Sequence, residues 1–225
     1  MSKTLNEMEA ELQEPIEHFD MKDKMNKIHN IDCIEFMKQV PDDYFDLVLT
    51  DPPYGIGDKF KGGKNSKMSN FNEVVDKGWD VAPSKEIFSE ILRISKNQII
   101  WGGNYFELPA TRGFLIWDKN ISEDFSLAMA EYGWTSFDKL AKIYKRNSDK
   151  LNRVHPTQKP ISIMEWCLYY AEVEKHHKVF DPFMGSGTTA VACQSLGLEW
   201  CGCELEADYV AIANKRLEKV QGSLF

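Results

Sequence analysis

The chain has 225 residues, of which 43% are hydrophobic, 28% charged and 12% aromatic. This composition excludes a disordered chain, and the length suits one α/β domain rather than two. No apolar run is long enough to cross a membrane and no secretory signal opens the sequence, so we expect a cytoplasmic protein without a membrane partner. The net charge of −8 argues against nucleic-acid binding through bulk charge alone.

Acidic residues concentrate at the start of the chain. Residues 1–23 hold seven acids against two lysines. Thr4 and Glu7 form a capping box, so the sequence predicts a short amphipathic helix that Pro15 ends, within an acidic extension over residues 1–25.

Strands and helices alternate along the rest of the chain. Short apolar runs that end in small or acidic residues predict strands near residues 26–32, 45–51, 97–103, 113–118, 178–181 and 198–204. Helical stretches are expected near residues 84–95, 160–174, 187–197 and 206–219. This alternation predicts a doubly wound, mostly parallel sheet that binds its ligands at the carboxyl ends of the strands.

The five cysteines are scattered and odd in number. Cys201 and Cys203 form a C-x-C pair with no second cluster beside it. We therefore expect buried free thiols in a reducing cytosol and no metal site.

The first motif that carries chemistry is Asp51-Pro52-Pro53-Tyr54, directly after a predicted strand. The prolines stiffen the turn and remove two backbone donors, so the carbonyls there can act as acceptors. Asp51 and the Pro52 carbonyl can each accept one hydrogen of an exocyclic amino group, and Tyr54 can stack on a flat base. The alternative is a proline-rich turn with a buried tyrosine.

The second motif is residues 179–189, a strand followed by a glycine turn and a helix. It has neither the lysine of a P-loop nor the third glycine of a dinucleotide fingerprint. Asp181 suits a ligand that carries an amino group, and Glu204, at the end of the next strand, can hold ribose hydroxyls. S-adenosylmethionine combines both features.

These two segments, DPPY and DPFMGSGTT, resemble motifs IV and I of the DNA amino-methyltransferases, in the order of the β group. Residues 30–35, 101–106, 117–119, 155–160 and 202–217 also resemble segments of this family, most closely of small phage-type adenine methylases. The resemblance implies a Rossmann-like class I methyltransferase fold with a circularly permuted motif order, formed by residues 26–220. It also implies methylation of N6 of adenine at specific DNA sites, after base flipping.

The resemblance assigns a role to each motif residue. The catalytic residues are Asp51, Pro52, Pro53 and Tyr54. The cofactor-binding residues are Asp32, Cys33, Thr157, Lys159, Asp181, Pro182, Phe183, Gly185, Ser186, Gly187, Thr188 and Glu204. Asp181 is expected at the methionine ammonium, Thr157 and Lys159 at its carboxylate, and Asp32 and Cys33 at the adenine edge. Phe183 is expected either to pack against the cofactor or to be a core residue.

Two segments are candidates for DNA contact, residues 55–83 and 119–153. They supply Lys59, Lys61, Lys64, Lys142, Lys145 and Arg146. A solvated surface explains the same lysines, and phosphate contacts would position DNA without reading its sequence.

Other readings stay open from the sequence. The target can be N4 of cytosine, although Asp at the first motif position favours adenine, and the chain can be a non-catalytic, cofactor-binding partner subunit. A dimer is compatible with the sequence. The tail, residues 221–225, resembles the Q-x-x-L-F peptide that docks on the bacterial sliding clamp, with packing onto the domain as the alternative.

Overall fold

The computed structural model describes residues 20–56, 80–122, 128–147 and 158–221. Its strands are β1 (Lys27–His29), β2 (Leu47–Thr50), β3 (Gln98–Trp101), β4 (Phe114–Asp118), β5 (Ala130–Thr135), β6 (Lys142–Lys145), β7 (Lys178–Asp181) and β8 (Glu199–Cys203). Its helices are α2 (Cys33–Met37), α4 (Lys85–Ile94), α5 (Ile161–Tyr170), α6 (Thr188–Ser195) and α7 (Ala207–Gln221), with 3-10 turns η1 (Met21–Lys24) and η3 (Gly103–Tyr105).

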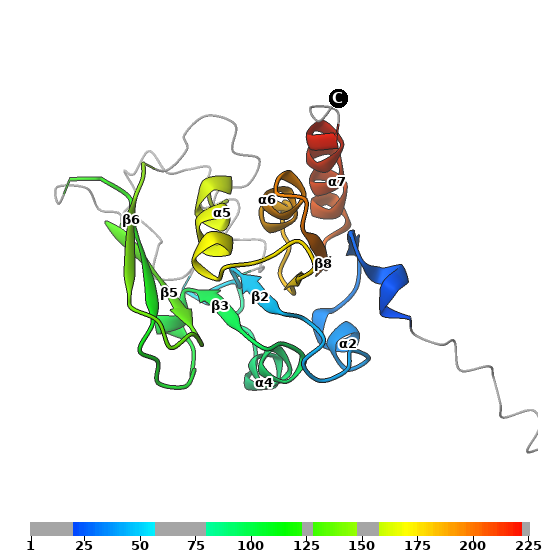
Figure 1. The fold of residues 1–225 in the computed structure, drawn as a ribbon, viewed down its shortest axis with the longest axis horizontal. Coiled ribbons are helices and arrows are strands. Elements are labelled where there is room, and N and C mark those ends of the chain that lie inside the picture. Colours follow the sequence, from blue (N-terminus) through cyan, green and yellow to red (C-terminus); the bar gives the residue numbers. More distant parts are fainter. Residues whose placement is uncertain (1–19, 57–79, 123–127, 148–157, 222–225) are drawn as a thin grey trace, which may run out of the picture.

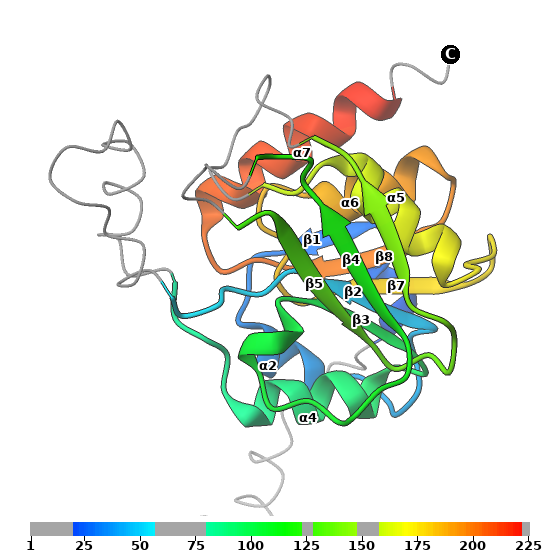
Figure 2. The ribbon, with the colours of Figure 1, turned by 90° about the vertical axis from the view of Figure 1, so that its left-hand side faces the viewer.

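The strands form one sheet between two layers of helices (Figures 1 and 2). Helices α5, α6 and α7 lie over one face, and α2 and α4 lie under the other (Figure 1). Side chains that alternate along β2 serve both layers, because Leu47 and Leu49 belong to the first core and Val48 to the second. A strand that is buried on both faces is continuously apolar, as β2 is up to Thr50.

The strand order is β1-β8-β7-β2-β3-β5-β4-β6. All neighbouring strands run parallel except that β5 is antiparallel to both β3 and β4. Strand β7 leads on to β8 on one side, and β2 leads on to β3 on the other, so the winding reverses between β7 and β2. Ligands of such sheets bind at this switch point, beyond the carboxyl ends of the strands.

The structure confirms the predicted parallel sheet and all of the expected strands and helices after residue 25. It adds two strands inside residues 119–153, which the sequence analysis took as a DNA-contact segment. Part of that segment is in fact an interior strand, because β5 lies between β3 and β4 and Trp134 is only 5% exposed. Gly133 interrupts the apolar pattern of β5, since the Trp101 ring lies 3.3 Å from where its Cβ would be.

The ends of the chain divide differently from the predicted boundaries. Residues 1–19, with the predicted helix, and residues 222–225, with most of the clamp-like peptide, lie outside the described residues. Met21 of η1, which precedes the predicted boundary at residue 26, is buried in the core under α2. All five cysteines are free and buried, as expected. Among the described helices, none is both long and apolar enough for a membrane span.

Candidate active site

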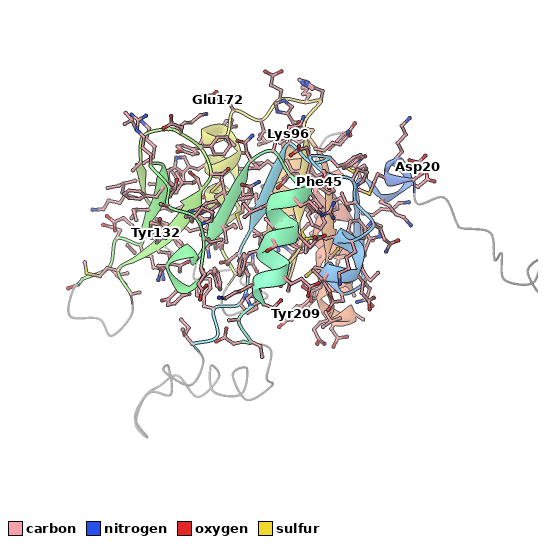
Figure 3. All side chains as sticks on the ribbon, turned by 90° about the horizontal axis from the view of Figure 1, so that it is seen from below. Asp20, Phe45, Lys96, Tyr132, Glu172 and Tyr209 are labelled. Atoms are coloured by element: carbon pink, nitrogen blue, oxygen red, sulfur yellow. The ribbon has the colours of Figure 1, made fainter. Side chains whose placement is uncertain are left out.

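Polar residues that follow different strands meet at one edge of the sheet. Figure 3 shows the two edges, with Lys96 and Glu172 near the amino ends of β3 and β7 and with Tyr209, past the end of β8, on the opposite side. Asp32, Glu204, Asp181 and Asp51 all end or follow parallel strands at this second edge. The parallel register therefore gathers both sequence motifs around the switch point.

Asp51 directly follows β2 and is held through one carboxylate oxygen. The Tyr54 hydroxyl donates a hydrogen bond to Asp51 Oδ1 at 2.7 Å. The Lys159 ammonium donates to the same Oδ1 at 2.5 Å. Burial raises the pKa of Asp51, and Lys159 offsets only part of that effect.

Lys159 belongs to a chain of buried charges. Its Nζ also lies 2.9 Å from Glu131 Oε2, and Glu131 Oε1 lies 2.7 Å from Lys119 Nζ. Burial opposes ionisation of Glu131, but the ammonium groups of Lys159 and Lys119 outweigh it and lower the pKa of Glu131 to about 2. Burial likewise opposes the charge on Lys159, and the carboxylates of Asp51 and Glu131 outweigh it, so its pKa is raised and it stays protonated.

The position of Lys159 bears on its predicted role. Its ammonium has three donors, and it has three acceptors in the protein: Asp51, Glu131 and, at 3.1 Å, the Tyr54 hydroxyl. The side chain is 3% exposed. The predicted contact of Lys159 with a cofactor carboxylate would require it to change partners, and it stays a prediction.

Aromatic residues surround Tyr54. A Cβ on Gly102 would lie 2.1 Å from Tyr54 Cε1, so the ring needs a glycine there, and Gly102 also has a positive φ of 69°. Tyr105 stacks on Tyr54 with ring centroids 5.0 Å apart, and it is 47% exposed. The pair extends an aromatic surface from the buried Asp51 towards solvent.

A carboxylate closes the turn that follows Tyr54. Asp80 accepts hydrogen bonds from the amides of Gly55 at 2.9 Å and Ile56 at 2.8 Å. Two residues that come before the undescribed segment 57–79 are thereby joined to one that comes after it. This contact fixes the backbone of Tyr54 from its far side.

Asp181 ends β7 and has neutral hydrogen-bond partners. Its Oδ1 accepts from the Thr50 hydroxyl at 2.7 Å and from the Phe183 amide at 3.0 Å, and its Oδ2 accepts from the Thr189 hydroxyl at 2.6 Å. Asp181 is 2% exposed, and burial raises its pKa to about 6. In this arrangement it orders the glycine turn and joins it to β2, while its predicted contact with a ligand ammonium stays untested.

The glycine turn leads into α6. Gly185 and Gly187 have positive φ of 52° and 83°. A Cβ on Gly187 would lie 2.7 Å from the Ala213 Cβ of α7, whereas a Cβ on Gly185 would meet nothing nearer than 4.0 Å. The space above Gly185 and the free amides at the start of α6 fit a ligand that lies against the turn.

Arg216 of α7 stabilises the outer side of this turn. Its guanidinium donates to the Ser186 carbonyl and, at 3.0 Å, to the Ser186 hydroxyl. Ser186 and Thr188 are buried, as is Pro182, and Phe183 packs partly buried against the core under α2. Both roles expected for Phe183 stay predictions, since its ring is only partly buried.

Glu204 and Asp32 complete the cofactor side of the edge. Glu204 accepts from the Gly185 amide at 2.7 Å and from the Glu206 amide at 2.8 Å, and burial raises its pKa. Each oxygen keeps a lone pair for a hydroxyl donor. Asp32 accepts from the Ile34 amide at 2.7 Å and caps α2, and Cys33 is 8% exposed with its pKa raised to about 12 by burial.

Three of the candidate DNA contacts lie in the described residues, on or beside β6. Lys142 and Lys145 are three residues apart on β6, so they project from opposite faces of the strand. Arg146 follows β6 at the end near Asp118, to which its amide donates at 2.9 Å. Lys59, Lys61, Lys64 and Thr157 lie outside the described residues.

Sequence reasoning missed four residues that the structure brings to the site: Lys119, Glu131, Thr50 and Arg216. Glu131 lies in an unrecognised antiparallel strand, Thr50 directly precedes the DPPY motif, and Lys119 and Arg216 lie inside segments quoted for the resemblance without a role of their own. No specific signal in the sequence pointed to Glu131, since its strand is only half buried.

The comparisons with known proteins agree with this geometry. The M.HinfI type II methyltransferase of Haemophilus influenzae is 27% identical, over 90% of this chain and 71% of the relative. The structure of the M1.HpyAVI–SAM complex has 21% identity and a TM-score of 0.54, over 85% of this chain and 98% of that one. The cytosine-N4-specific PvuII DNA methyltransferase has 15% identity and a TM-score of 0.58, over 87% and 92%.

These two structures support the fold. The family follows from a match to the N6_N4_Mtase family model, described as DNA methylase, across residues 96–215, more than half of the chain. The chain belongs to this family of DNA methylases.

Proposed function

We propose that the protein transfers a methyl group from S-adenosylmethionine to N6 of adenine in DNA. The observation that carries the proposal is the position of Asp51 at the switch point, next to the glycine turn of Asp181. Thr50 joins the two motifs directly through its hydrogen bond to Asp181. A target amine at Asp51 and a donor at the turn would therefore be neighbours, and such placement is a large part of the acceleration of a group transfer.

The residues around Asp51 suit an aromatic amine. An amine conjugated to a ring is a poor nucleophile, because its lone pair is delocalised. Acceptors at Asp51 and at the Pro52 carbonyl would draw its hydrogens out of the ring plane and concentrate the lone pair on nitrogen. Tyr54 and the exposed Tyr105 offer a stacking surface for a base that has left the duplex, and stacking contributes ~1–3 kcal/mol per base.

The residues around the glycine turn fit S-adenosylmethionine. Glu204 has lone pairs for ribose hydroxyls, Gly185 leaves space above the turn, and Asp32 lies at the end of the neighbouring strand β1. When bound there, the cofactor supplies an activated methyl group. The chain itself orients the acceptor amine and excludes water.

Adenine is named as the target because Asp, here Asp51, stands at the first position of the motif, which in the amino-methyltransferases that this chain resembles favours adenine over cytosine. N4 of cytosine is the second candidate target, because the cytosine-N4-specific PvuII enzyme has the same fold.

The decisive experiment is incubation of the protein with mixed-sequence DNA and isotope-labelled S-adenosylmethionine, followed by nucleoside mass spectrometry. We expect labelled N6-methyladenine. Labelled N4-methylcytosine would overturn the adenine assignment and keep the amino-methyltransferase, whereas no labelled nucleoside would contradict both.

A further inference from the structure

Glu131 is a partly buried charge that no motif explains. It lies near the start of β5, and because β5 runs antiparallel to its neighbours, this start is at the ligand-binding edge of the sheet. Its side chain is 22% exposed, and each oxygen contacts a different ammonium group: Lys119 at 2.7 Å and Lys159 at 2.9 Å. Of these groups Lys159 is the most buried, at 3% exposed, so Glu131 supplies one of the two carboxylates that offset the charge of a buried ammonium.

Four charges of alternating sign lead from Lys119 to Asp51. The order is Lys119, Glu131, Lys159 and Asp51, with nitrogen–oxygen distances of 2.7, 2.9 and 2.5 Å. The formal charge of the four groups together is zero. If Lys159 left this position, Asp51 would lose its cation and Glu131 would keep only Lys119.

This chain also decides which oxygen of Asp51 is available. Lys159 and Tyr54 both donate to Oδ1. Among the described residues, none donates a hydrogen bond to Oδ2. The carboxylate is thus fixed through Oδ1, and Oδ2 is the oxygen proposed to accept the incoming amine.

We propose that Glu131 is a positioning residue for methyl transfer, which, together with Lys119, anchors Lys159 on Asp51 and so keeps the catalytic carboxylate in one orientation. This proposal rests on the proposed role of Asp51. It does not depend on whether the target is adenine or cytosine, because the same carboxylate would accept either amine.

The electrostatics around Asp51 give the test its direction. The titratable groups that interact electrostatically with Asp51 are Lys159, Glu131, Tyr54, Asp181 and Cys167. Glu131 is the acidic neighbour that raises the pKa of Asp51 most, after burial. Lys119 lowers the pKa of Glu131 and screens its charge from the rest of the site.

The experiment compares two variants that remove opposite charges, Glu131→Gln and Lys119→Gln. The pH dependence of kcat is measured for the intact protein with DNA and S-adenosylmethionine. In Glu131→Gln the acid limb should move to lower pH by roughly one unit, because a negative charge beside Asp51 is gone. In Lys119→Gln it should move to higher pH, by less, because Glu131 is then less screened. Exposed Glu107, which pairs with Lys85, supplies the control Glu107→Gln, with no shift expected.

A merely structural role would lower kcat in both variants without shifting the acid limb of the pH profile. It could also shift the acid limb in the same direction in both variants. Either result would overturn the proposal. Calorimetry with S-adenosylmethionine should give wild-type affinity for both variants, because neither Glu131 nor Lys119 is expected to contact the cofactor. A loss confined to that affinity would instead place Lys159 at the cofactor.

A second readout does not need activity. The wild type should lose unfolding free energy as pH falls from about 4.5 to about 2, because the pKa of Glu131 is lowered to about 2, and Glu131→Gln should lose less over this interval. An equal loss in the two proteins would contradict the buried charge chain. If the wild type transferred no methyl group, this readout would still report on the series of charges from Lys119 to Asp51. Only the proposed function would then have failed.

Discussion

Asp51 and Asp181 lie at the ends of adjacent strands, and burial raises the pKa of both. Their partners differ in kind. Asp181 has two threonine hydroxyls and one amide, and no described cation contacts it. Asp51 has a lysine ammonium and a tyrosine hydroxyl on one oxygen.

The difference bears on the roles proposed for the two carboxylates. Neutral donors on both oxygens of Asp181 fix its geometry without a cation. A cation on Oδ1 of Asp51 offsets part of the effect of burial, and among the described residues no donor contacts Oδ2. Of the four predictions below, in order of decreasing effect, the first and third test this contrast directly, and the others concern the glycine turn and β6.

Removing the charge of Asp51 should have the largest effect. Asp51→Asn keeps the shape of the side chain but weakens the acceptor, so kcat should fall roughly 10²-fold or more, as when one preorganised polar group is removed from an active site. Affinity for S-adenosylmethionine should stay near wild type by calorimetry. The control is Asp138→Asn, an exposed partner of Arg112. Near-normal turnover of Asp51→Asn would show that another group accepts the amine.

The two glycines of the turn should respond differently to alanine. Each alanine substitution is strained by about 1–2 kcal/mol, because an alanine would have to adopt a positive φ. Only in Gly187→Ala does the new Cβ also meet Ala213 of α7. We expect Gly187→Ala to lower the free energy of unfolding by more than Gly185→Ala does. Gly185→Ala should mainly weaken binding of S-adenosylmethionine. Denaturant unfolding and calorimetry measure the two effects, and equal destabilisation with unchanged affinity would remove Gly185 from the ligand site.

The pH dependence of stability should report on Asp181. Its folded pKa of about 6 lies above the usual value of 3.8, so the folded state binds more protons between these pH values than the unfolded chain. Stability contributed by this group is then greatest below pH about 4 and decreases by about 3 kcal/mol as pH rises to about 6. Asp181→Asn should flatten that decrease, since threonine hydroxyls can accept as well as donate. Urea unfolding between pH 4 and pH 7 measures the free energy of unfolding at each pH. If Asp181→Asn leaves its decrease with pH unchanged, that decrease would be assigned to Asp51 instead.

The smallest effect is expected at β6. Lys145 lies opposite Asp118 at the ligand-binding edge, whereas Lys142 lies opposite Leu115 and on the other face. Lys145→Gln should reduce the slope of log K against log salt by ~1 on any DNA sequence, and Lys142→Gln should leave it unchanged. Equal effects of the two substitutions would point to diffuse attraction, and a sequence-dependent effect would point to base contact.

Much of the cofactor side could be predicted because its determinants are local. A glycine turn between a buried strand and a helix has a recognisable pattern, and parallel strands carry Asp32, Glu204, Asp181 and Asp51 to one edge whatever the loops do. The DPPY motif was likewise readable, since two prolines and an aromatic residue next to an aspartate form a local arrangement.

The rest depended on contacts between distant residues. Lys159 and Asp51 are 108 residues apart, and only the packing of α5 against the sheet brings them to 2.5 Å. Strand β5 escaped recognition because its pattern contains Glu131 and Gly133, and each of these is explained by a neighbour on another strand or loop. The sequence by itself thus determined the sheet, its edge and the two motifs. Tertiary structure alone decided which carboxylate is paired with a cation. That pairing depends on three-dimensional proximity and burial, which leave no periodic pattern in the sequence.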